Sequence, residues 1–328
     1  MSHSNQPEAQ LLARILKQAG GVSHRTQGGR LPVGIGDDAA LYRPSPRNET
    51  ILTCDWFLDG THFLVEKHPA ESIGWKCLAR AVSDVAAMGG MPRCFLLNLA
   101  LPASRSGAWL DEFLKGLRMA IRAFGCDLAG GDTTRSKQVL LNIAVIGEVA
   151  AGFGVTRSGA RAGDSIFVSG RLGEAELGLR LVGLKKGPLH SKNPLLQKHL
   201  YPEPRLALGQ WLAKNRLATA MMDLSDGLSS DLPRLCAASK SGAQIDATLI
   251  PTPRGLAASK RLQLALHGGD DYELLFTVKP QNALRIPAKI AGVRLTRIGT
   301  ITAATRLVVK TGNGKIEELK NRGWDPFC

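Results

Sequence analysis

Residues 51–90 read ILTCDWFLDGTHFLVEKHPAESIGWKCLARAVSDVAAMGG. Residues 51–54 predict a strand that ends at Asp55. Residues 70–88 predict a helix that ends at Gly89-Gly90, because one apolar stripe recurs there at helical spacing. The members of the stripe are Ile73, Cys77, Leu78, Ala81, Val82 and Val85. The stretch therefore predicts a strand, a loop and a helix in that order.

The same patterns extend outward in both directions. In the first half we expect helices over 7–19 and 109–124, and strands over 95–101 and 139–149. In the second half we expect helices over 172–182, 205–215 and 228–239, and strands over 165–169, 220–222, 273–278 and 306–310. Helices and strands mix without strict alternation, which favours an α+β (mixed α/β) fold over a doubly wound sheet. Glycines follow residue 150, so we expect two domains, 1–150 and 151–328.

Two segments predict connections. Residues 311–314, Thr-Gly-Asn-Gly, are typical of the turn of a late hairpin. Residues 185–201 are rich in Lys, His, Pro and Gly, so we expect an exposed, mobile loop there.

Composition excludes several classes of protein. The 328 residues are 44% hydrophobic and 21% charged, which fits a folded chain and not a disordered one. No apolar run approaches the ~20 residues that span a bilayer, and the polar N-terminus lacks a secretion signal, so we expect a cytoplasmic protein without a membrane segment. The six cysteines form no CxxC pair, so neither a zinc site nor a disulfide framework is indicated.

Positive charge is concentrated in the second half. The formal net charge is +14, of which residues 151–328 carry +12. Such a field favours a polyanion, either nucleic acid or a phosphorylated small molecule. No block of five Lys or Arg is present and aromatic residues make up only 5%, which disfavours nucleic acid as the partner and leaves it as an alternative.

Aspartates at turns and strand ends carry the chemical signal. Five segments share this placement: 36–38, 53–55, 130–132, 223–227 and 268–271, with Asp84 near the apolar stripe of a helix. Converging carboxylates repel one another unless cations neutralise them, and Mg²⁺ commonly bridges carboxylates to substrate phosphates. The pattern indicates metal-assisted phosphoryl transfer, although any one Gly-Asp pair is also typical of an ordinary turn.

Common nucleotide motifs do not explain the chain. It has no GxxxxGK[ST] and no protein-kinase signature. Residues 34–39 match GxGxxA, but Asp37 and Asp38 would repel a dinucleotide and Pro44 leaves little room for the helix. Arg157 could bind a phosphate or be a solvated loop residue. His62 could bind a ligand or be a structural or surface residue. Trp324 could cover a ring-shaped substrate or only pack the end of the chain.

Taken together, the motifs resemble the thiamine-monophosphate kinase family, within the ATP-binding superfamily that includes aminoimidazole ribonucleotide synthetase. The resembling segments are 34–40, Asp55 with 60–63, 83–89, 130–134, 156–160, 223–228 and 268–274. The resemblance implies the reaction ATP + thiamine monophosphate → ADP + thiamine diphosphate, the last step of thiamine diphosphate biosynthesis, by direct in-line transfer. The enzyme would be a phosphotransferase with a phosphate group as acceptor, ATP its co-substrate and Mg²⁺ its metal.

The resemblance also implies residue roles. The metal residues would be Asp38, Thr53, Cys54, Asp55, Asp84, Asp132, Asp223 and Asp226, of which Asp38, Asp55 and Asp132 would be catalytic. ATP would contact Gly131, Asp132, Arg157 and Ser225, and thiamine monophosphate would contact His62, Asp270 and Trp324. The implied fold is the two-domain aminoimidazole ribonucleotide synthetase-like fold, with an N-terminal sheet that forms a barrel across a homodimer and a C-terminal domain that completes the active site.

Three residues depart from the family pattern. Cys54 stands where a Thr or Ser hydroxyl usually reaches a metal, and a thiol is a poor Mg²⁺ ligand. Asp270 replaces the usual Glu, so Asp271 or a water would complete its contact. Trp324 replaces the common Tyr.

Other members of the superfamily remain alternatives. A hydrogenase-maturation carbamoyl dehydratase is one, because that group ends in a cysteine and this chain ends in Cys328. An aminoimidazole ribonucleotide synthetase-like ligase is another. Selenophosphate synthetase is disfavoured, because no cysteine precedes Cys54.

Overall fold

A computed structural model describes residues 8–19, 29–184 and 193–327. The chain divides into two compact units. Unit 1 comprises Met1–Val85, Met91–Ala151 and Leu184–Ser191, and unit 2 comprises Ala86–Gly90, Gly152–Gly183 and Lys192–Cys328. Within the described residues, none of the helices has both the length and the apolar character needed to cross a membrane.

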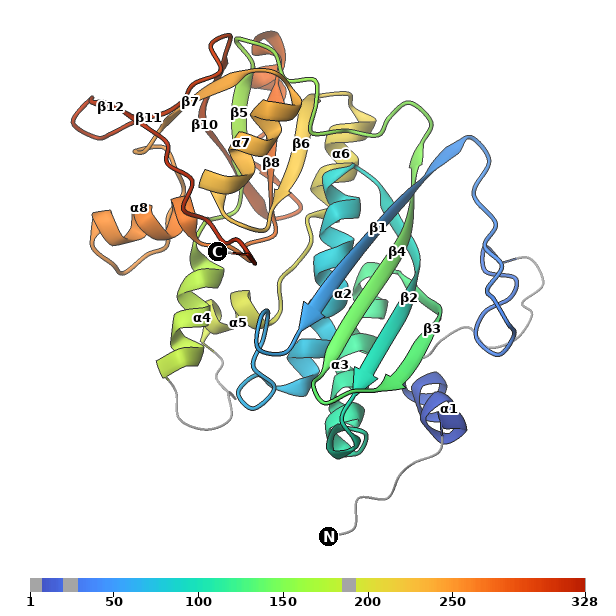
Figure 1. The fold of residues 1–328 in the computed structure, drawn as a ribbon. Helices are drawn as coiled ribbons and strands as arrows, with labels where there is room; N and C mark the ends of the chain where they lie inside the picture. The colour runs from blue at the N-terminus through green and yellow to red at the C-terminus, as the bar shows by residue number, and fades with distance from the viewer. Residues whose placement is uncertain (1–7, 20–28, 185–192, 328) are drawn as a thin grey trace. The chain divides into compact units, whose positions relative to one another are not determined.

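Unit 1 is built on a four-stranded sheet in the order β1-β4-β2-β3 (Figure 1). Its strands are β1 (Asn48–Leu58), β2 (Met91–Leu101), β3 (Asp127–Arg135) and β4 (Leu140–Ala150). β4 pairs antiparallel with β1 and β2, whereas β2 and β3 are parallel. Along β1, Ile51 and Phe57 are buried while Leu52 and Trp56 are exposed, which is the alternation of a strand covered on one face.

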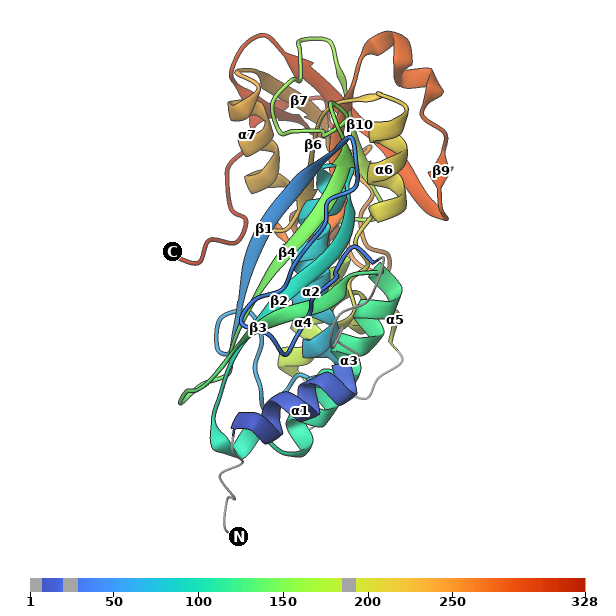
Figure 2. The same cartoon turned by 90° about the vertical axis from the view of Figure 1, so that its right-hand side faces the viewer.

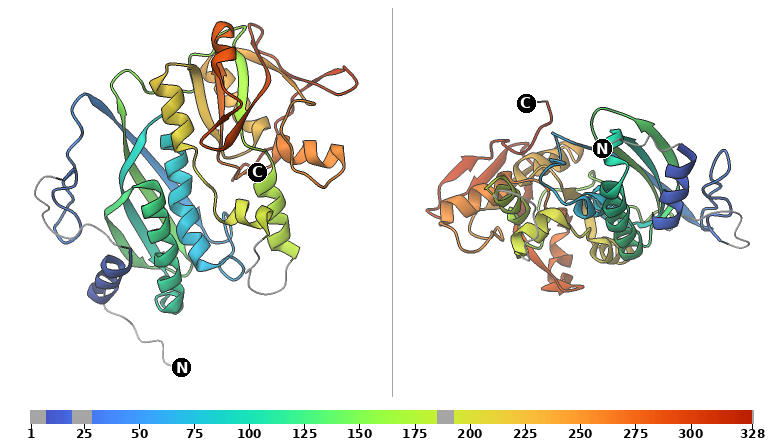
Figure 3. Two further views of the ribbon diagram at one scale, coloured as in Figure 1. Left: turned by 180° about the vertical axis from the view of Figure 1, so that it is seen from behind. Right: turned by 90° about the horizontal axis from the view of Figure 1, so that it is seen from below.

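Helices α2 (Ala70–Ala87) and α3 (Ala108–Phe124) cover one face of this sheet, as Figure 3 (left) shows. Glycines let the two helices approach closely, because a Cβ on Gly74 would lie 2.0 Å from Phe113 O and one on Gly116 1.8 Å from Glu71 O. Helix α1 (Glu8–Ala19) lies beside α3 (Figure 2), where Arg14 pairs with Asp111. The 3₁₀ helix η1 (Ala103–Arg105) precedes α3.

Unit 2 contains an eight-stranded sheet with the order β12-β11-β7-β10-β5-β8-β6, and β9 pairs with β10. The strands are β5 (Ser165–Ser169), β6 (Ala218–Leu224), β7 (Gly242–Asp246), β8 (Glu273–Val278), β9 (Lys289–Ile290), β10 (Val293–Thr302), β11 (Leu307–Lys310) and β12 (Ile316–Glu318). The helices are α4 (Glu174–Leu184), α5 (Pro194–Leu200), α6 (Leu206–Lys214), α7 (Leu228–Ala238), α8 (Ala258–His267) and the 3₁₀ helix η2 (Pro280–Arg285). Two apolar clusters fill the unit, one including α7 and the other α6.

The predicted mixed α+β content is confirmed, as are the predicted helices and the late hairpin, where Thr311 N donates to Lys315 O. The elements that were not predicted include the strands β3, β7, β9 and β10, the helix α8 and the 3₁₀ helices η1 and η2. The prediction of a loop over 185–201 was wrong for its second half, because Pro194–Leu200 form the helix α5, which Asn193 caps and in which Leu196 and His199 are buried. Residues 185–192 lie outside the described residues.

Candidate active site

Strand β1 carries three of the predicted residues, and its pleat sorts them onto two faces. Successive side chains of a strand point to opposite faces, so Thr53 and Asp55 share the face of the buried Phe57, whereas Cys54 points the other way. Thr53 Oγ1 donates a hydrogen bond of 2.5 Å to Asp84 Oδ2 on α2. The sheet and the helix therefore bring Thr53, Asp55 and Asp84 to one side of β1.

An arginine that the sequence analysis did not single out faces the same side. The guanidinium carbon of Arg80 lies 5.2 Å from the centroid of the Phe57 ring. Arg80 and Asp84 are four residues apart on α2, so they lie on one helical face. Because Asp55 lies between Thr53 and Phe57 along β1, it faces the part of α2 that carries this pair. The i, i+4 spacing was the signal that could have identified Arg80.

The opposite face of the sheet carries Cys54 and Asp132. Cys54 is exposed, and its Sγ accepts a hydrogen bond of 3.1 Å from Asn142 Nδ2. The register runs from Trp56 through Asn142 and Asn98 to Asp132, which puts all four side chains on one face. The thiol of Cys54 is thus on the face of Asp132 and away from the hydroxyl of Thr53.

Asp132 and Asp55 are separated by the strand order. β1 and β3 are the two edges of the sheet, and three strand spacings amount to about 14 Å. A single copy of unit 1 therefore does not bring these two predicted catalytic carboxylates together.

The backbone requires glycine at position 131, since its φ is +147° and a Cβ there would lie 1.8 Å from Leu97 O of β2.

Two further predicted residues lie in loops of unit 1. Asp38 is exposed in the loop closed by the Leu41 N to Val33 O hydrogen bond. His62 follows β1, and its Nδ1 accepts a hydrogen bond of 3.0 Å from Leu58 N. A neutral His62 therefore carries its proton on Nε2, which leaves that nitrogen as a donor.

Unit 2 brings together predicted residues from three distant segments of the sequence. Asp223 is buried near the end of β6, and Ser225 and Asp226 follow that strand. Asp270 N donates to Ser225 O at 2.7 Å, and Trp324 N donates to Asp226 O at 3.0 Å. The end of β6, the loop before β8 and the C-terminal segment thus form one site.

Asp226 belongs to a cluster of charged side chains that was not predicted from the sequence. Arg234 of α7 pairs with the carboxylates of Asp226 and Asp231. Asp231 is fully buried and accepts hydrogen bonds from the backbone N–H groups of Asp226 and Gly227, at 3.0 and 3.1 Å. Burial, together with the charge of Asp226, raises the pKa of Asp231 to about 7.

The loop before β8 has strained backbone at two positions. Asp270 and Tyr272 have φ of +67° and +50°, a region that side chains other than glycine rarely adopt. Tyr272 OH donates to Asp270 Oδ1 at 2.9 Å. Asp271 does not complete a contact beside Asp270, because its buried carboxylate accepts the N–H groups of Gly173 and Ala175 at the start of α4. Burial raises the pKa of Asp271 well above its usual range.

Arg157 lies apart from this group. Its carbonyl accepts a hydrogen bond of 3.0 Å from Ser239 Oγ, and Ser239 caps the C-terminal end of α7. Ser225 and Asp226 precede the other end of that helix, which is about 16 Å long. The backbone of unit 2 therefore does not place Arg157 beside Ser225.

Most of the predicted metal residues offer oxygen atoms, which suit a hard cation. Carboxylate and hydroxyl oxygens are the ligands that Mg²⁺ prefers. Within the described ranges, however, no three His, Cys, Asp or Glu side chains meet closely enough to hold a metal ion. The oxygen donors thus occur as smaller groups, Thr53 with Asp84 in unit 1 and Asp223 near Asp226 in unit 2.

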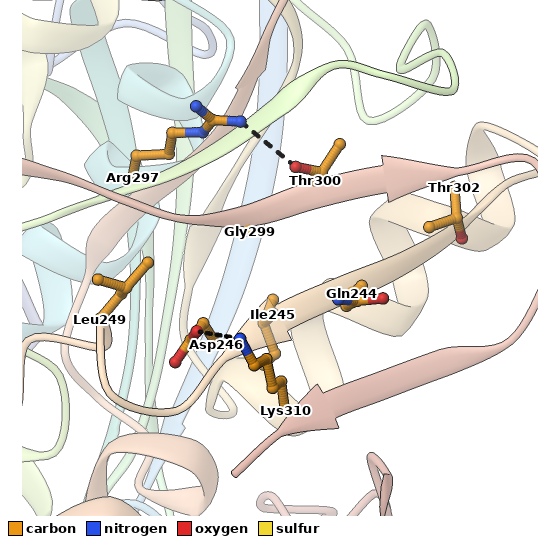
Figure 4. A pocket seen from close by; sticks show the side chains of 9 residues that line it. All are labelled: Gln244, Ile245, Asp246, Leu249, Arg297, Gly299, Thr300, Thr302 and Lys310. Atoms are coloured by element: carbon orange, nitrogen blue, oxygen red, sulfur yellow. Dashed lines mark hydrogen bonds and ion pairs between the residues drawn. The ribbon is translucent and has the colours of Figure 1, made fainter. Parts of the chain in front are cut away.

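Unit 2 also has a cavity of about 470 Å³ on the face of β7 and β10, shown in Figure 4. It is lined by Gln244, Ile245, Asp246, Leu249, Arg297, Gly299, Thr300, Thr302 and Lys310. None of the residues predicted from sequence lines this cavity. Two cationic side chains line it: Arg297 donates to Thr300 Oγ1 at 3.5 Å, and Lys310 pairs with Asp246 at 3.9 Å.

Both halves of the chain match one family of proteins. Residues 36–149 match AIR synthase related protein, N-terminal domain, and residues 161–312 match the C-terminal domain of the same proteins. The thiamine-monophosphate kinase of Escherichia coli (strain K12) is 37% identical over 314 residues, which cover 93% of this chain and 95% of that protein.

Solved structures agree with these matches. The thiamine-monophosphate kinase from Stenotrophomonas maltophilia K279a has a TM-score of 0.78 and 35% identity, covering 94% of this chain and 95% of that one. AaThiL complexed with AMPPCP and TMP has a TM-score of 0.74 and 30% identity, covering 99% of each chain. The hydrogenase maturation protein HypE in complex with ATP has a TM-score of 0.77 but only 18% identity, which is a likeness of fold alone.

Proposed function

Because this chain belongs to the AIR synthase related proteins and, within them, to the thiamine-monophosphate kinase family, we propose that the residues described above carry out that family's reaction. The chain is an enzyme, a phosphotransferase that makes thiamine diphosphate from thiamine monophosphate and ATP. The convergence of Ser225, Asp226, Asp270 and Trp324 at the ends of β6 and β8 carries the proposal for the site, since these residues come from three distant segments.

The residue roles follow from what phosphoryl transfer requires. The protein has little covalent chemistry to do and acts by positioning two anions and stabilising charge. We propose that Ser225, Gly131 and Arg157 bind ATP, and that His62, Asp270 and Trp324 orient thiamine monophosphate. His62 can donate through Nε2, because its Nδ1 accepts Leu58 N.

The carboxylates would hold Mg²⁺. When bound, Mg²⁺ neutralises phosphate charge and lowers the cost of bringing carboxylates and phosphates together. The proposed ligands are Asp38, Thr53, Cys54, Asp55, Asp84, Asp132, Asp223 and Asp226. Their oxygen chemistry supports the assignment, with the single sulfur of Cys54 as the exception.

A homodimer is part of the proposal. The face of the unit 1 sheet that lies away from α2 and α3 exposes Leu52, Trp56 and Leu96, by 75%, 57% and 36%. Large apolar side chains gathered on one sheet face are typical of a contact surface. β1 and β3 are the two edge strands of this sheet, so pairing between the edges of two copies would close the two sheets into the proposed barrel.

We infer a cytoplasmic location as well. Cys54, Cys77, Cys94, Cys126 and Cys236, the cysteines of the described residues, are all free. Unpaired thiols are typical of a reducing compartment. ATP as co-substrate supports the same inference.

The test is a product assay. Purified protein with ATP, Mg²⁺ and thiamine monophosphate is expected to form ADP and thiamine diphosphate in equal amounts. Reactions with EDTA, or with thiamine in place of its monophosphate, are the controls and are expected to form none. Formation of aminoimidazole ribonucleotide from its own precursor, without thiamine diphosphate, would reassign the substrate.

A further inference from the structure

The buried histidine of α5 lies beside the proposed substrate carboxylate. The side chain of His199 is 1% exposed, and its Nδ1 is 3.8 Å from Asp270 Oδ2. This distance is an electrostatic contact and is longer than a hydrogen bond. The other oxygen, Asp270 Oδ1, accepts the hydroxyl of Tyr272 at 2.9 Å. Each oxygen of the Asp270 carboxylate thus has its own neighbour.

Packing between helices fixes where His199 lies. Asn193 caps α5 by accepting Leu195 N at 2.9 Å. α5 crosses α4 at Gly178, where a Cβ would lie 2.3 Å from Leu195 O and 2.8 Å from His199 Cβ. Any larger residue at Gly178 would push α5 away, so the glycine sets the approach of His199 to its neighbours.

Hydrogen bonds also fix the backbone conformation at Asp270. The strained left-handed conformations of Asp270 and Tyr272 persist because Asp270 N donates to Ser225 O and Tyr272 N donates to Leu224 O at 2.9 Å. Strain of this kind is maintained where the surroundings over-determine the conformation, often at ligand sites. Backbone and side chain therefore both restrict the direction of the Asp270 carboxylate.

We propose that His199 is a positioning residue which, with Tyr272, aims the Asp270 carboxylate at the nitrogen-bearing, hydrogen-bond-donating part of the substrate. This inference rests on the proposed role of Asp270 in binding thiamine monophosphate. Asp reaches one methylene less far than the Glu common in the family, so its direction has less freedom to adapt. His199 acts through Asp270 and does not touch the reacting phosphates.

The test compares KM with kcat in single variants. His199→Leu removes the polar neighbour and keeps an apolar side chain in a buried helix. We expect KM for thiamine monophosphate to rise roughly tenfold, the loss of one contact to a charged group, while kcat and KM for ATP change by less than about twofold. His199→Asn keeps a polar group near the place of Nδ1 and is expected to restore KM to within about threefold of wild type.

A double variant distinguishes positioning from a general loss of structure. If His199 acts through Asp270, adding His199→Leu to Asp270→Ala is expected to change KM by less than about twofold. Tyr272→Phe, which keeps the buried ring and removes only the hydroxyl, is expected to raise KM about threefold alone and to have no effect in the Asp270→Ala protein. If His199→Leu shows no cooperative melting transition and is therefore not folded, Tyr272→Phe provides the test of the inference in its place.

His68 is the matched control, a second buried histidine whose Nδ1 accepts Leu64 N at 3.1 Å. His68→Leu is expected to lower the melting temperature and leave KM unchanged. Unchanged KM in His199→Leu, additive effects in the double variant, or an equal rise in KM for ATP would each overturn the inference. If Asp270→Ala leaves KM unchanged in an active kinase, the inference fails while the function stands; a wild-type protein that forms no thiamine diphosphate would instead refute the function.

Discussion

The thiol of Cys54 is the one soft donor among the proposed metal residues. It lies on the face of Asp132, opposite to the Thr53–Asp84 pair. If a metal is bound on that face, a hydroxyl would serve it better than sulfur. The Cys54 side chain is accessible and accepts a hydrogen bond from the amide of Asn142, so a smaller oxygen donor fits the same space.

We expect Cys54→Ser to lower the Mg²⁺ concentration for half-maximal activity several-fold and to reduce the relative activity with Mn²⁺. Titrations of both metals at saturating ATP and thiamine monophosphate measure this shift. Thr53→Ser, which keeps the hydroxyl on the other face, is the control and is expected to leave the Mg²⁺ titration unchanged. Identical titrations for wild type and Cys54→Ser would remove Cys54 from the metal set.

Glu148 anchors the segment before β1 to the sheet. Its buried carboxylate accepts hydrogen bonds from Tyr42, Ser45 N and Asn48, and it pairs with Arg93 at 3.1 Å. Burial alone would raise the pKa of Glu148, but these hydrogen bonds outweigh it and lower the pKa to about 2.

A carboxylate with a lowered pKa stabilises the fold above its ordinary pKa and loses that contribution as pH falls toward the lowered value. We expect Glu148→Gln to reduce the free energy of unfolding by about 2 kcal/mol at pH 7, because contacts to a charged group are lost. The difference between wild type and variant is expected to shrink between pH 4.5 and pH 2. Chemical denaturation at several pH values measures it; a difference independent of pH would contradict the role given to the charge.

The C-terminal segment shows how one glycine positions an element. Gly323 precedes Trp324, and a Cβ there would lie 2.2 Å from both Asp226 O and Ser230 Oγ. Ser230 Oγ also donates to Asn321 Oδ1 at 2.5 Å. The segment can therefore lie against the start of α7 only because residue 323 has no side chain.

Gly323→Ala is expected to displace Trp324 and to raise KM for thiamine monophosphate about fivefold to tenfold, as Trp324→Ala would. Gly312→Ala is the control, since a Cβ at Gly312 would meet only Thr248 Cγ2 at 3.6 Å. Steady-state kinetics measure both. A normal KM in Gly323→Ala with an altered one in Trp324→Ala would mean that the segment adapts.

Local patterns predicted those elements that bury a periodic stripe. Residues 70–88 predicted α2 because its apolar residues repeat every three or four positions, and Gly89 ends it. β3 was missed because Asp127–Arg135 reads DLAGGDTTR, and its strand form depends on pairing with β2. α5 was missed for a similar reason, since the composition of the segment hid a helix whose Leu196 and Leu200 are buried in the folded chain.

The site residues also divide into those that local sequence patterns identified and those that depend on long-range contacts. Ser225, Asp226 and Asp270 were identifiable because glycines surround them, and the structure brings them together. The separation of Asp55 from Asp132 was not predictable, because the order of strands in a sheet is set by long-range pairing. Arg234 and His199 were also missed, since each acts through a contact that no local motif encodes.

The face of the unit 1 sheet that exposes Leu52, Trp56 and Leu96 leads to a prediction about assembly. Trp56 is 57% exposed on that face, and a charge there would oppose burial against a second copy. We expect the wild type to be a dimer in light scattering and Trp56→Glu to be a folded monomer with little activity. Leu284→Glu, at a side chain that is 99% exposed in η2, is the control and is expected to stay dimeric. A monomeric, active wild type would refute the proposed dimer.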